Sequence, residues 1–259
     1  MLDNKFPDFY ELNLTGENMK KLLLLAVASA AAFAPVAHAE EENPGIAVSL
    51  KAGTLGAGVE LDYAFNKNFN VRVQLNSFTY DDSFDEDGIT YSGDLELKSV
   101  GLLADWRPFS GVFKLTGGAY KNDNKISAAA VSNGDAEFEI GDYSYAGSAS
   151  DPLTLAANMD LGNGTAGYLG FGWGNSYSSG FSFSLDLGVL FSGSAQASIA
   201  ASGTAYRVDN PDVQFDVAGS SAEAQMFRDE IEAERRNLQG DLDEFEYYPV
   251  ISIGLGYLF

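Results

Sequence analysis

The sequence contains no cysteine, and its single histidine is His38. Without cysteine the chain has no disulfide framework, no thiolate metal site and no lipid-bearing cysteine. Apart from a stretch that starts near Met19, it also lacks the roughly 20 apolar residues of a transmembrane helix, and its mean hydropathy is -0.08. Any membrane span in the rest of the chain must therefore be made of strands, which hydropathy does not detect.

Glycine and aromatic residues are abundant, with 28 Gly, 13 Tyr and 18 Phe in 259 residues. This composition fits tightly curved sheet and is typical of neither a helical protein nor a disulfide-stapled one. The formal net charge is -22, which opposes binding to nucleic acid or anionic lipid through a general basic field. We expect no nucleic-acid partner.

The stretch 19–39 has the order of a secretory signal peptide. A basic start at Lys20 and Lys21 precedes an apolar run, and Ala37 and Ala39 form a small-x-small cleavage site. A single transmembrane anchor is the rival interpretation, but the run is short and is broken by Pro35. The expected organisation is an upstream mis-start over 1–18 (or else an extended n-region), a signal peptide over 19–39 and the mature protein over 40–259.

Period-two alternation recurs in segments near the 9–11 residues that a transmembrane strand needs. In the clearest one, Phe181 and Phe183 share a face that is opposite Ser182 and Asp186. A soluble sandwich would alternate equally, so the period alone does not decide between the two. The predicted strands are Ile46–Gly53, Leu55–Phe65, Phe69–Tyr80, Leu95–Trp106, Val112–Tyr120, Gly167–Asn175, Phe181–Phe191 and Val250–Phe259.

The connections between these eight segments alternate in length. The second, fourth and sixth are short, at 66–68, 107–111 and 176–180, as periplasmic turns of outer-membrane barrels are. The other connections are then outer loops, namely the acidic 81–88 and the long 121–166 and 192–246. The first outer connection, near Thr54, is tight and is an exception.

The last segment ends in a pattern typical of barrel assembly signals, with Ser252, Gly254, Tyr257 and a final Phe259. With the signal peptide and the alternation, it resembles small outer-membrane barrels of the OmpA transmembrane domain and OmpW group. The resemblance implies an all-β fold, a transmembrane antiparallel up-and-down barrel of about eight strands in a Gram-negative outer membrane. It also implies lipid, lipopolysaccharide and the barrel-assembly machinery as partners, and a monomer.

The strand phases place eight charged residues inside the barrel. An eight-stranded interior is just wide enough for side chains, and charges buried there must be paired. We therefore predict a salt-bridged plug, unless some phases are wrong and the charges lie at the rims. The predicted residues are Lys51, Glu60, Asp62, Arg72, Glu96, Lys98, Lys114 and Asp186.

The 81–88 loop concentrates carboxylates at Asp81, Asp82, Asp85 and Asp87. Oxygen ligands suit calcium or magnesium, and such an ion could bridge lipopolysaccharide phosphates. The spacing does not match an EF-hand, so a solvated acidic hairpin is favoured over a metal site. A glycine-rich stretch at 53–61 lacks the Gly-Lys-Ser/Thr of a phosphate-binding loop and is read as strand and turn.

The outer loops contain further elements. Ser220 and Glu223 form a capping box before an apolar stripe that includes Phe227 and Ile231, which predicts a helix that Gly240 interrupts or ends. It would pack on its own barrel or form a lid over the lumen. Residues 136–145 predict a hairpin with its turn at Gly141-Asp142.

With His38 lost alongside the signal peptide, the mature chain has neither histidine nor cysteine. Barrel enzymes of this size commonly rely on a histidine base, so we expect no enzyme, no catalytic residue and no cofactor. The leading hypothesis is a non-enzymatic barrel with an envelope-structural or surface-interaction role and a plugged lumen. The alternatives are a narrow channel for small or hydrophobic solutes, as the OmpW resemblance implies, and a surface adhesin.

Overall fold

A computed structural model describes residues 45–132, 136–162, 164–174, 180–243 and 245–259 of the chain. These residues all belong to one compact unit, Glu42–Phe259. The predicted upstream segment, the signal peptide and the cleavage residues Ala37 and Ala39 lie outside the described residues.

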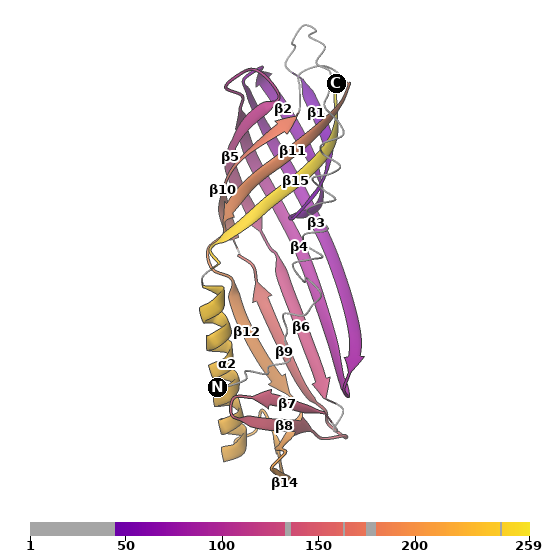
Figure 1. Ribbon diagram of the computed structural model, residues 1–259, viewed down its shortest axis with the longest axis vertical. Coiled ribbons are helices and arrows are strands. Elements are labelled where there is room, and N and C mark those ends of the chain that lie inside the picture. The colour runs from indigo at the N-terminus through magenta and orange to yellow at the C-terminus, as the bar shows by residue number, and fades with distance from the viewer. Residues whose placement is uncertain (1–44, 133–135, 163, 175–179, 244) are drawn as a thin grey trace. The chain divides into compact units, whose positions relative to one another are not determined.

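Eight antiparallel strands of this unit close into a ring (Figure 1). Each strand is hydrogen-bonded to its neighbours, and β4 pairs with β5 to complete the circle. The ring order is β1 (Ile46–Gly53), β2 (Gly56–Asn66), β3 (Phe69–Glu86), β4 (Ile89–Trp106), β5 (Phe113–Asn122), β10 (Gly164–Gly174), β11 (Gly180–Phe191) and β15 (Tyr247–Leu258). The all-β fold and the eight predicted barrel strands are confirmed.

Side chains of the ring alternate between the lumen and the exterior, as the period-two pattern requires. On β1, Val48 and Leu50 are exposed, whereas Ser49 and Lys51 are buried. On β15, Ile253, Leu255 and Tyr257 are exposed. The ring therefore has an apolar outside and a polar inside, the reverse of a soluble protein.

The sheet continues beyond the ring as an arm, because β3 and β4 each run for 18 residues. The far half of β4 pairs with β6 (Lys125–Ser132) instead of β5, and the sheet goes on through β9 (Leu153–Asp160) to β12 (Gln196–Ser202). The 121–166 and 192–246 connections thus contribute strands to this arm, in addition to loops.

The outward face of the sheet changes character at the pair Ser77 and Lys98. Towards the ring, the outward pairs are apolar, such as Leu75 opposite Val100. Away from it they are polar, beginning with Thr79 opposite Glu96. Apolar side chains of the arm turn instead to the face that continues the lumen side. The register of β3 and β4 is unbroken at this point, so the exchange of polar and apolar faces reflects a different environment around the strands and not a change in the strands themselves.

The prediction of an acidic outer loop over 81–88 was wrong. These residues form the end of β3, and only Asp87 and Gly88 form the turn to β4, with positive φ at both. The cross-strand register runs unbroken to Glu86 opposite Ile89. The prediction failed because a run of acidic residues has low strand propensity. Here the strand is tolerated because both faces of this hairpin end are exposed, so the carboxylates remain in water.

A second, four-stranded sheet and a helix cover the inner face of the arm over β4, β6, β9 and β12 and leave its β3 part exposed. The strands are β7 (Glu137–Ile140), β8 (Tyr143–Gly147), β13 (Thr204–Arg207) and β14 (Asn210–Asp216), and the helix is α2 (Ala222–Leu242). The β7–β8 hairpin with its Gly141-Asp142 turn is as predicted. Their shared apolar core contains Ile89, Leu153, Tyr145, Phe215 and the fully buried Phe227.

The helix differs from its prediction in two respects. Its N-cap is Ser221, whose hydroxyl accepts from the Ala224 N–H, rather than Ser220. Gly240 does not interrupt it, and the helix continues to Leu242. It packs against β12, β7 and β14, so it covers the arm and is no lid over the lumen. Among the described residues, no helix is long and apolar enough to cross a membrane.

Candidate functional site: the closed lumen

An ionic cluster fills the lumen, and Arg72 on β3 lies at its centre. The Arg72 guanidinium is 2.6 Å from Glu60, 2.8 Å from Asp105 and 3.4 Å from Asp186. These four side chains come from four strands, β2, β3, β4 and β11. All are at least 94% buried. The guanidinium therefore ties opposite walls of the ring together.

Two lysines complete this cluster from two further strands, β1 and β5. Lys51 on β1 is 2.5 Å from Asp186 and 3.8 Å from Glu60. Lys114 on β5 is 2.8 Å from Asp186 and 3.7 Å from Asp105. Asp186 thus accepts from three cations. Each of these six charged side chains has at least one oppositely charged partner in the cluster, which is the condition under which charges can be buried at all.

The structure brings together six of the eight predicted lumen residues. Five form the cluster around Arg72, and Asp62 lies beside it, where both carboxylate oxygens accept from the Asn70 amide at 3.0 and 2.9 Å. The prediction was wrong for Glu96 and Lys98. These two form an exposed ion pair on the outward face of the arm.

The error at Glu96 and Lys98 has a physical cause. On β4 the inward residues are odd-numbered, as Ser99 and Asp105 show, so the assumed phase was shifted by one residue. Apolar side chains occur in both phases of this strand because its apolar face changes sides at the start of the arm. A period-two pattern cannot reveal such a reversal.

The residue that sequence reasoning missed is Asp105. It contacts Arg72, accepts from the Thr116 hydroxyl at 2.7 Å and accepts from the Asn70 amide at 2.8 Å. The sequence did contain a signal for Asp105, because it lies between Ala104 and Trp106, which belong to an apolar row of even-numbered, outward-facing residues. That row fixes the phase of the ring half of β4.

An aromatic layer lies beside the ionic cluster and closes the lumen further. Tyr120 and Tyr168 meet edge to face, with ring centroids 5.6 Å apart, within a buried group that includes Leu103. The Tyr120 hydroxyl donates to Gln74 at 2.7 Å. The described lumen is thus packed with side chains in two layers, as the narrow interior of an eight-stranded barrel allows.

Glycines on the lumen face make room for these rings. A Cβ at Gly188 would clash with the Tyr168 hydroxyl, and one at Gly101 would clash with the Tyr120 ring. On the outer face, a Cβ at Gly167 would meet only Phe191, at an ordinary 3.9 Å. The high glycine content therefore has a specific use inside this barrel.

Gly188→Ala is expected to lower the free energy of unfolding by about 1–3 kcal/mol, because the added methyl displaces Tyr168 in a filled lumen. Urea unfolding of the refolded barrel in detergent measures this. Gly167→Ala, which adds the same methyl outside, should change stability by less than about 0.5 kcal/mol. Equal losses in the two variants would mean that the lumen is not tightly packed.

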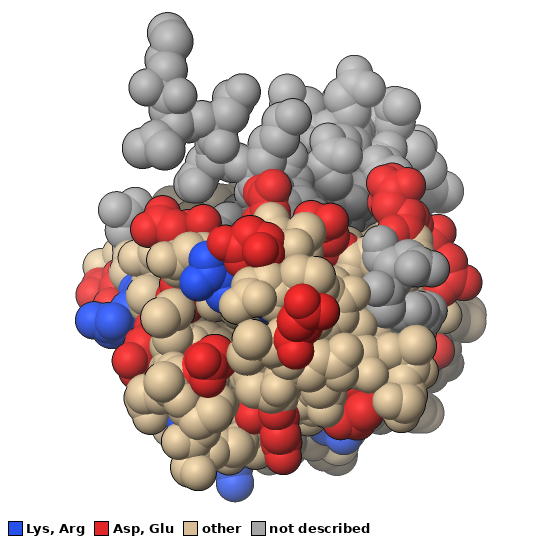
Figure 2. Space-filling model, turned by 90° about the horizontal axis from the view of Figure 1, so that it is seen from below, with Lys and Arg blue, Asp and Glu red and all other residues tan. Residues whose placement is uncertain are grey.

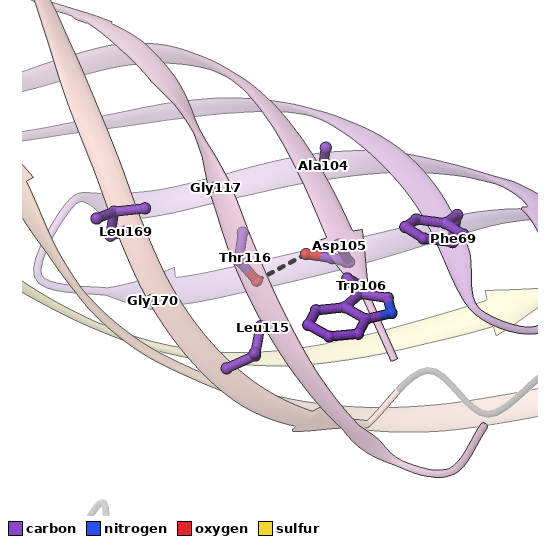
Figure 3. Close-up of a pocket in the computed structure, with 9 residues that line it drawn as sticks. All are labelled: Phe69, Ala104, Asp105, Trp106, Leu115, Thr116, Gly117, Leu169 and Gly170. Atoms are coloured by element: carbon purple, nitrogen blue, oxygen red, sulfur yellow. Dashed lines mark hydrogen bonds between the residues drawn. The ribbon is translucent and has the colours of Figure 1, made fainter. Parts of the chain in front are cut away.

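A recess of about 390 Å³ lies on the outer wall, not in the lumen (Figure 3). Phe69, Trp106, Leu115 and Leu169 line it, over the smaller Ala104 and Gly117, and Asp105 and Thr116 lie behind them on the lumen side. Because it opens onto the apolar exterior, it is suited to hydrocarbon and provides no path through the ring.

The carboxylates considered for a metal do not converge. On β3, Asp81 and Asp85 share one face, and Asp82 lies on the other. Asp85 accepts from the Thr90 hydroxyl, and Asp82 from the Tyr80 hydroxyl. In the described part of the chain no group of three or more His, Cys, Asp or Glu could hold a metal ion.

The four residues of the predicted assembly signal lie on β15 or directly after it. Ser252 is buried on the lumen face, and Gly254 lies against Lys51 and Ser184. Tyr257 and Phe259 are exposed on the outer face, with ring centroids 5.1 Å apart. Their role in assembly stays a prediction.

A titratable contact joins the helix to the small sheet of the arm. The Tyr145 hydroxyl donates to Glu230 at 3.0 Å. Burial raises the pKa of Glu230, opposed by that hydrogen bond and assisted by the nearby Asp142. The folded arm therefore holds this proton more tightly than the unfolded chain does. The stability that Glu230 contributes is fully present below the pKa of an unfolded glutamate and is lost as pH rises through the raised pKa of Glu230.

Glu230→Gln is expected to weaken the pH dependence of arm stability, because the amide still accepts from Tyr145 but does not titrate. Protease resistance of the arm, followed from mildly acidic to neutral pH, measures the effect. Glu139→Gln, at an exposed site on β7, is the control. If both variants alter the pH profile equally, the contact between Glu230 and Tyr145 does not cause it.

The closed ring, apolar outside and filled with paired charges inside, defines the chain as a small β-barrel of the outer-membrane type. No protein-family model and no curated protein matches the chain by sequence. Among solved structures it is similar to CarO and CarO2 of Acinetobacter baumannii. The CarO match has 21% identity and a TM-score of 0.53, and the CarO2 match 22% and 0.54. Each covers 85% of this chain and 100% of the other, and at this identity the likeness shows the fold.

Proposed function

We propose that the chain is a non-enzymatic outer-membrane barrel whose lumen is closed and whose arm serves an envelope-structural or surface-interaction role. The observation that carries this proposal is the cluster around Arg72, which links the strands of the ring across the lumen. A general diffusion pore needs an open, hydrated interior. The function is therefore assigned to the surfaces of the barrel and not to its interior.

Aromatic side chains on the exterior support placement in a membrane. At the end of the ring with the short turns, Phe113 contacts Trp173, and Phe181 contacts Tyr257. At the other end, exposed Phe191 contacts Tyr247. Such belts mark the two interfaces of a membrane-spanning barrel. CarO, whose fold this chain shares, is an outer-membrane barrel protein, which supports the same membrane.

The orientation follows from the turns and from the arm. Short turns of these barrels face the periplasm and long connections face outward. The arm, which has a polar outward face from Lys98 onwards, then lies outside the cell. Lipid and lipopolysaccharide would surround the ring, and the resemblance to the OmpA and OmpW group stays a prediction, as does a monomeric state.

Planar-bilayer recording of the purified, refolded chain tests the closed lumen. We expect no steady single-channel current, because passage would require separation of Arg72 from its three carboxylates. Folding and insertion are verified separately by the heat-dependent gel mobility of the same sample. A steady current from folded protein would favour the alternative, a narrow channel for small or hydrophobic solutes.

Removal of the arm tests the surface role. In the shortened chain, the arm parts of the β3–β4, β5–β10 and β11–β15 connections are replaced by short turns. It should still insert, because the eight ring strands pair with one another without the arm. Loss of cell attachment in that variant would identify a surface adhesin. Loss of envelope integrity without loss of attachment would identify a structural role.

A further inference from the structure

The two edges of the arm are unequal (Figure 1). On one side, β3 pairs with β2 only as far as Ser77. Beyond it, residues Phe78–Glu86 pair with β4 alone, so one side of their backbone has no strand partner among the described residues. We call these nine residues the open edge. All of them are exposed.

The opposite edge, β12, is protected by the helix. The Gln239 side chain accepts from the Ala197 N–H at 2.9 Å and donates to the Ala195 carbonyl at 2.8 Å. In this way an amide side chain supplies two of the backbone hydrogen bonds that a neighbouring strand would make. Free strand edges are templates for pairing, and proteins commonly cover them. Within the described part of the chain, α2 covers the β12 edge and nothing pairs with the open edge.

Side chains of the open edge combine aromatic surface with negative charge. Phe78, Tyr80 and Phe84 are 43%, 52% and 53% exposed and share one face. None of them belongs to the apolar core of the arm. The acidic residues are Asp81, Asp82, Asp85 and Glu86, and the open edge has no Lys or Arg. The far end of the arm is also rich in acidic side chains (Figure 2).

The aromatic rings and negative charge of the open edge indicate what kind of strand could pair with it. A second copy of the chain would bring carboxylates against carboxylates, which strongly opposes pairing between two open edges. A cationic segment would meet the opposite charge. In an extended segment with alternating basic and apolar residues, the apolar side chains would contact Phe78, Tyr80 and Phe84. Its cations would face Asp81 and Asp85 on the other face, while Asp82 and Glu86 add negative charge beside the aromatic rings.

We propose that the open edge of β3 binds an extended cationic peptide segment as an added strand. Backbone hydrogen bonds along the edge would supply affinity, and the alternating side chains would supply selectivity. The inference goes beyond the proposed function and shares with it only the position of the arm outside the membrane. Bilayer conductance tests the closed lumen, whereas peptide cross-linking tests the open edge, so one proposal can be disproved without the other.

Absence of cysteine allows a clean cross-linking test on the full refolded chain. The probe is a synthetic peptide of alternating lysine and valine, as long as the open edge, with one central cysteine. Ser83→Cys places a thiol on the open edge, and Ser198→Cys places the matched control on the covered edge of β12. Both serines are exposed. We expect disulfide formation with the peptide at position 83 and about tenfold less at position 198.

Two further variants separate strand addition from simple charge attraction. Conversion of the four acids of the open edge to their amides should weaken cross-linking at position 83 about tenfold, since several exposed ion pairs are lost. A peptide methylated on every backbone nitrogen keeps its charge but has no N–H to donate from either edge, so it cannot add as a strand and should fail to cross-link.

Three results would overturn the proposal. Equal cross-linking at positions 83 and 198 would show that the edge is not selective. Equal cross-linking by the methylated peptide would show attraction without strand addition. Disulfide-linked dimers of Ser83→Cys in the absence of peptide would show that the open edge pairs with a second copy.

Discussion

Arg72→Met is expected to lower the free energy of unfolding by about 3–5 kcal/mol, the usual cost of removing one partner from a buried ionic group. Glu60, Asp105 and Asp186 each lose their contact with the guanidinium. The two lysines cannot replace it, because Lys51 and Lys114 already contact the same carboxylates. Urea unfolding in detergent, followed by tryptophan fluorescence, measures the loss.

Lys98→Met is the matched control for Arg72→Met. It removes a cation from the neighbouring strand, but the partner, Glu96, is exposed to water. Exposed pairs contribute about 0–1 kcal/mol, so the control should remain close to the original protein. A similar small effect in both variants would mean that the lumen is hydrated and that the Arg72 cluster does not hold the ring together.

Phe227→Ala is expected to destabilise the arm by about 3–5 kcal/mol, as truncation of a buried phenylalanine usually does. Phe227 is fully buried, and its ring meets Tyr145 edge to face at 4.9 Å and Phe215 at 6.1 Å. The helix would lose its main attachment to the small sheet. Limited proteolysis should show rapid cleavage within 192–246.

The neighbouring variant Met226→Ala controls for changes in the helix itself. Met226 is 43% exposed and lies outside the core of the arm. It should leave cleavage almost unchanged. The ring should also survive Phe227→Ala, since its strands pair independently of α2. Loss of heat-dependent gel mobility in that variant would show instead that ring and arm unfold as one cooperative unit.

The sequence predicted the ring because membrane and lumen impose opposite demands on alternate residues. In β11, Phe183 faces outward and Asp186 faces the lumen, so the pattern has few exceptions. The α2 helix and the β7–β8 hairpin were likewise visible from a local pattern, an apolar stripe and a turn. These features depend on neighbours close in the chain.

The arm was harder to predict, because its strands follow different demands. β6 and β9 are rich in small residues such as Ala129 and Ala156, whose alternation is weak. The acidic residues near Asp81 suggested a loop, although hydrogen bonds to β4 hold them in a strand. For the lumen cluster, Asp105 was missed and Glu96 and Lys98 were wrongly included, because the polar face of β4 changes sides along the strand.

The strand pairings join residues at very different separations along the chain, and this difference determines the expected order of folding. The β3–β4 hairpin closes over a two-residue turn and aligns 18 residue pairs. The β1–β15 pairing joins Ala47 to Leu258, 211 positions apart in the chain. Closing a short loop restricts far fewer conformations than closing a long one, and distant pairings form slowly. We therefore expect the longest hairpin to act as a nucleus that carries part of ring and arm together, and the seam between the first and last strands to close last.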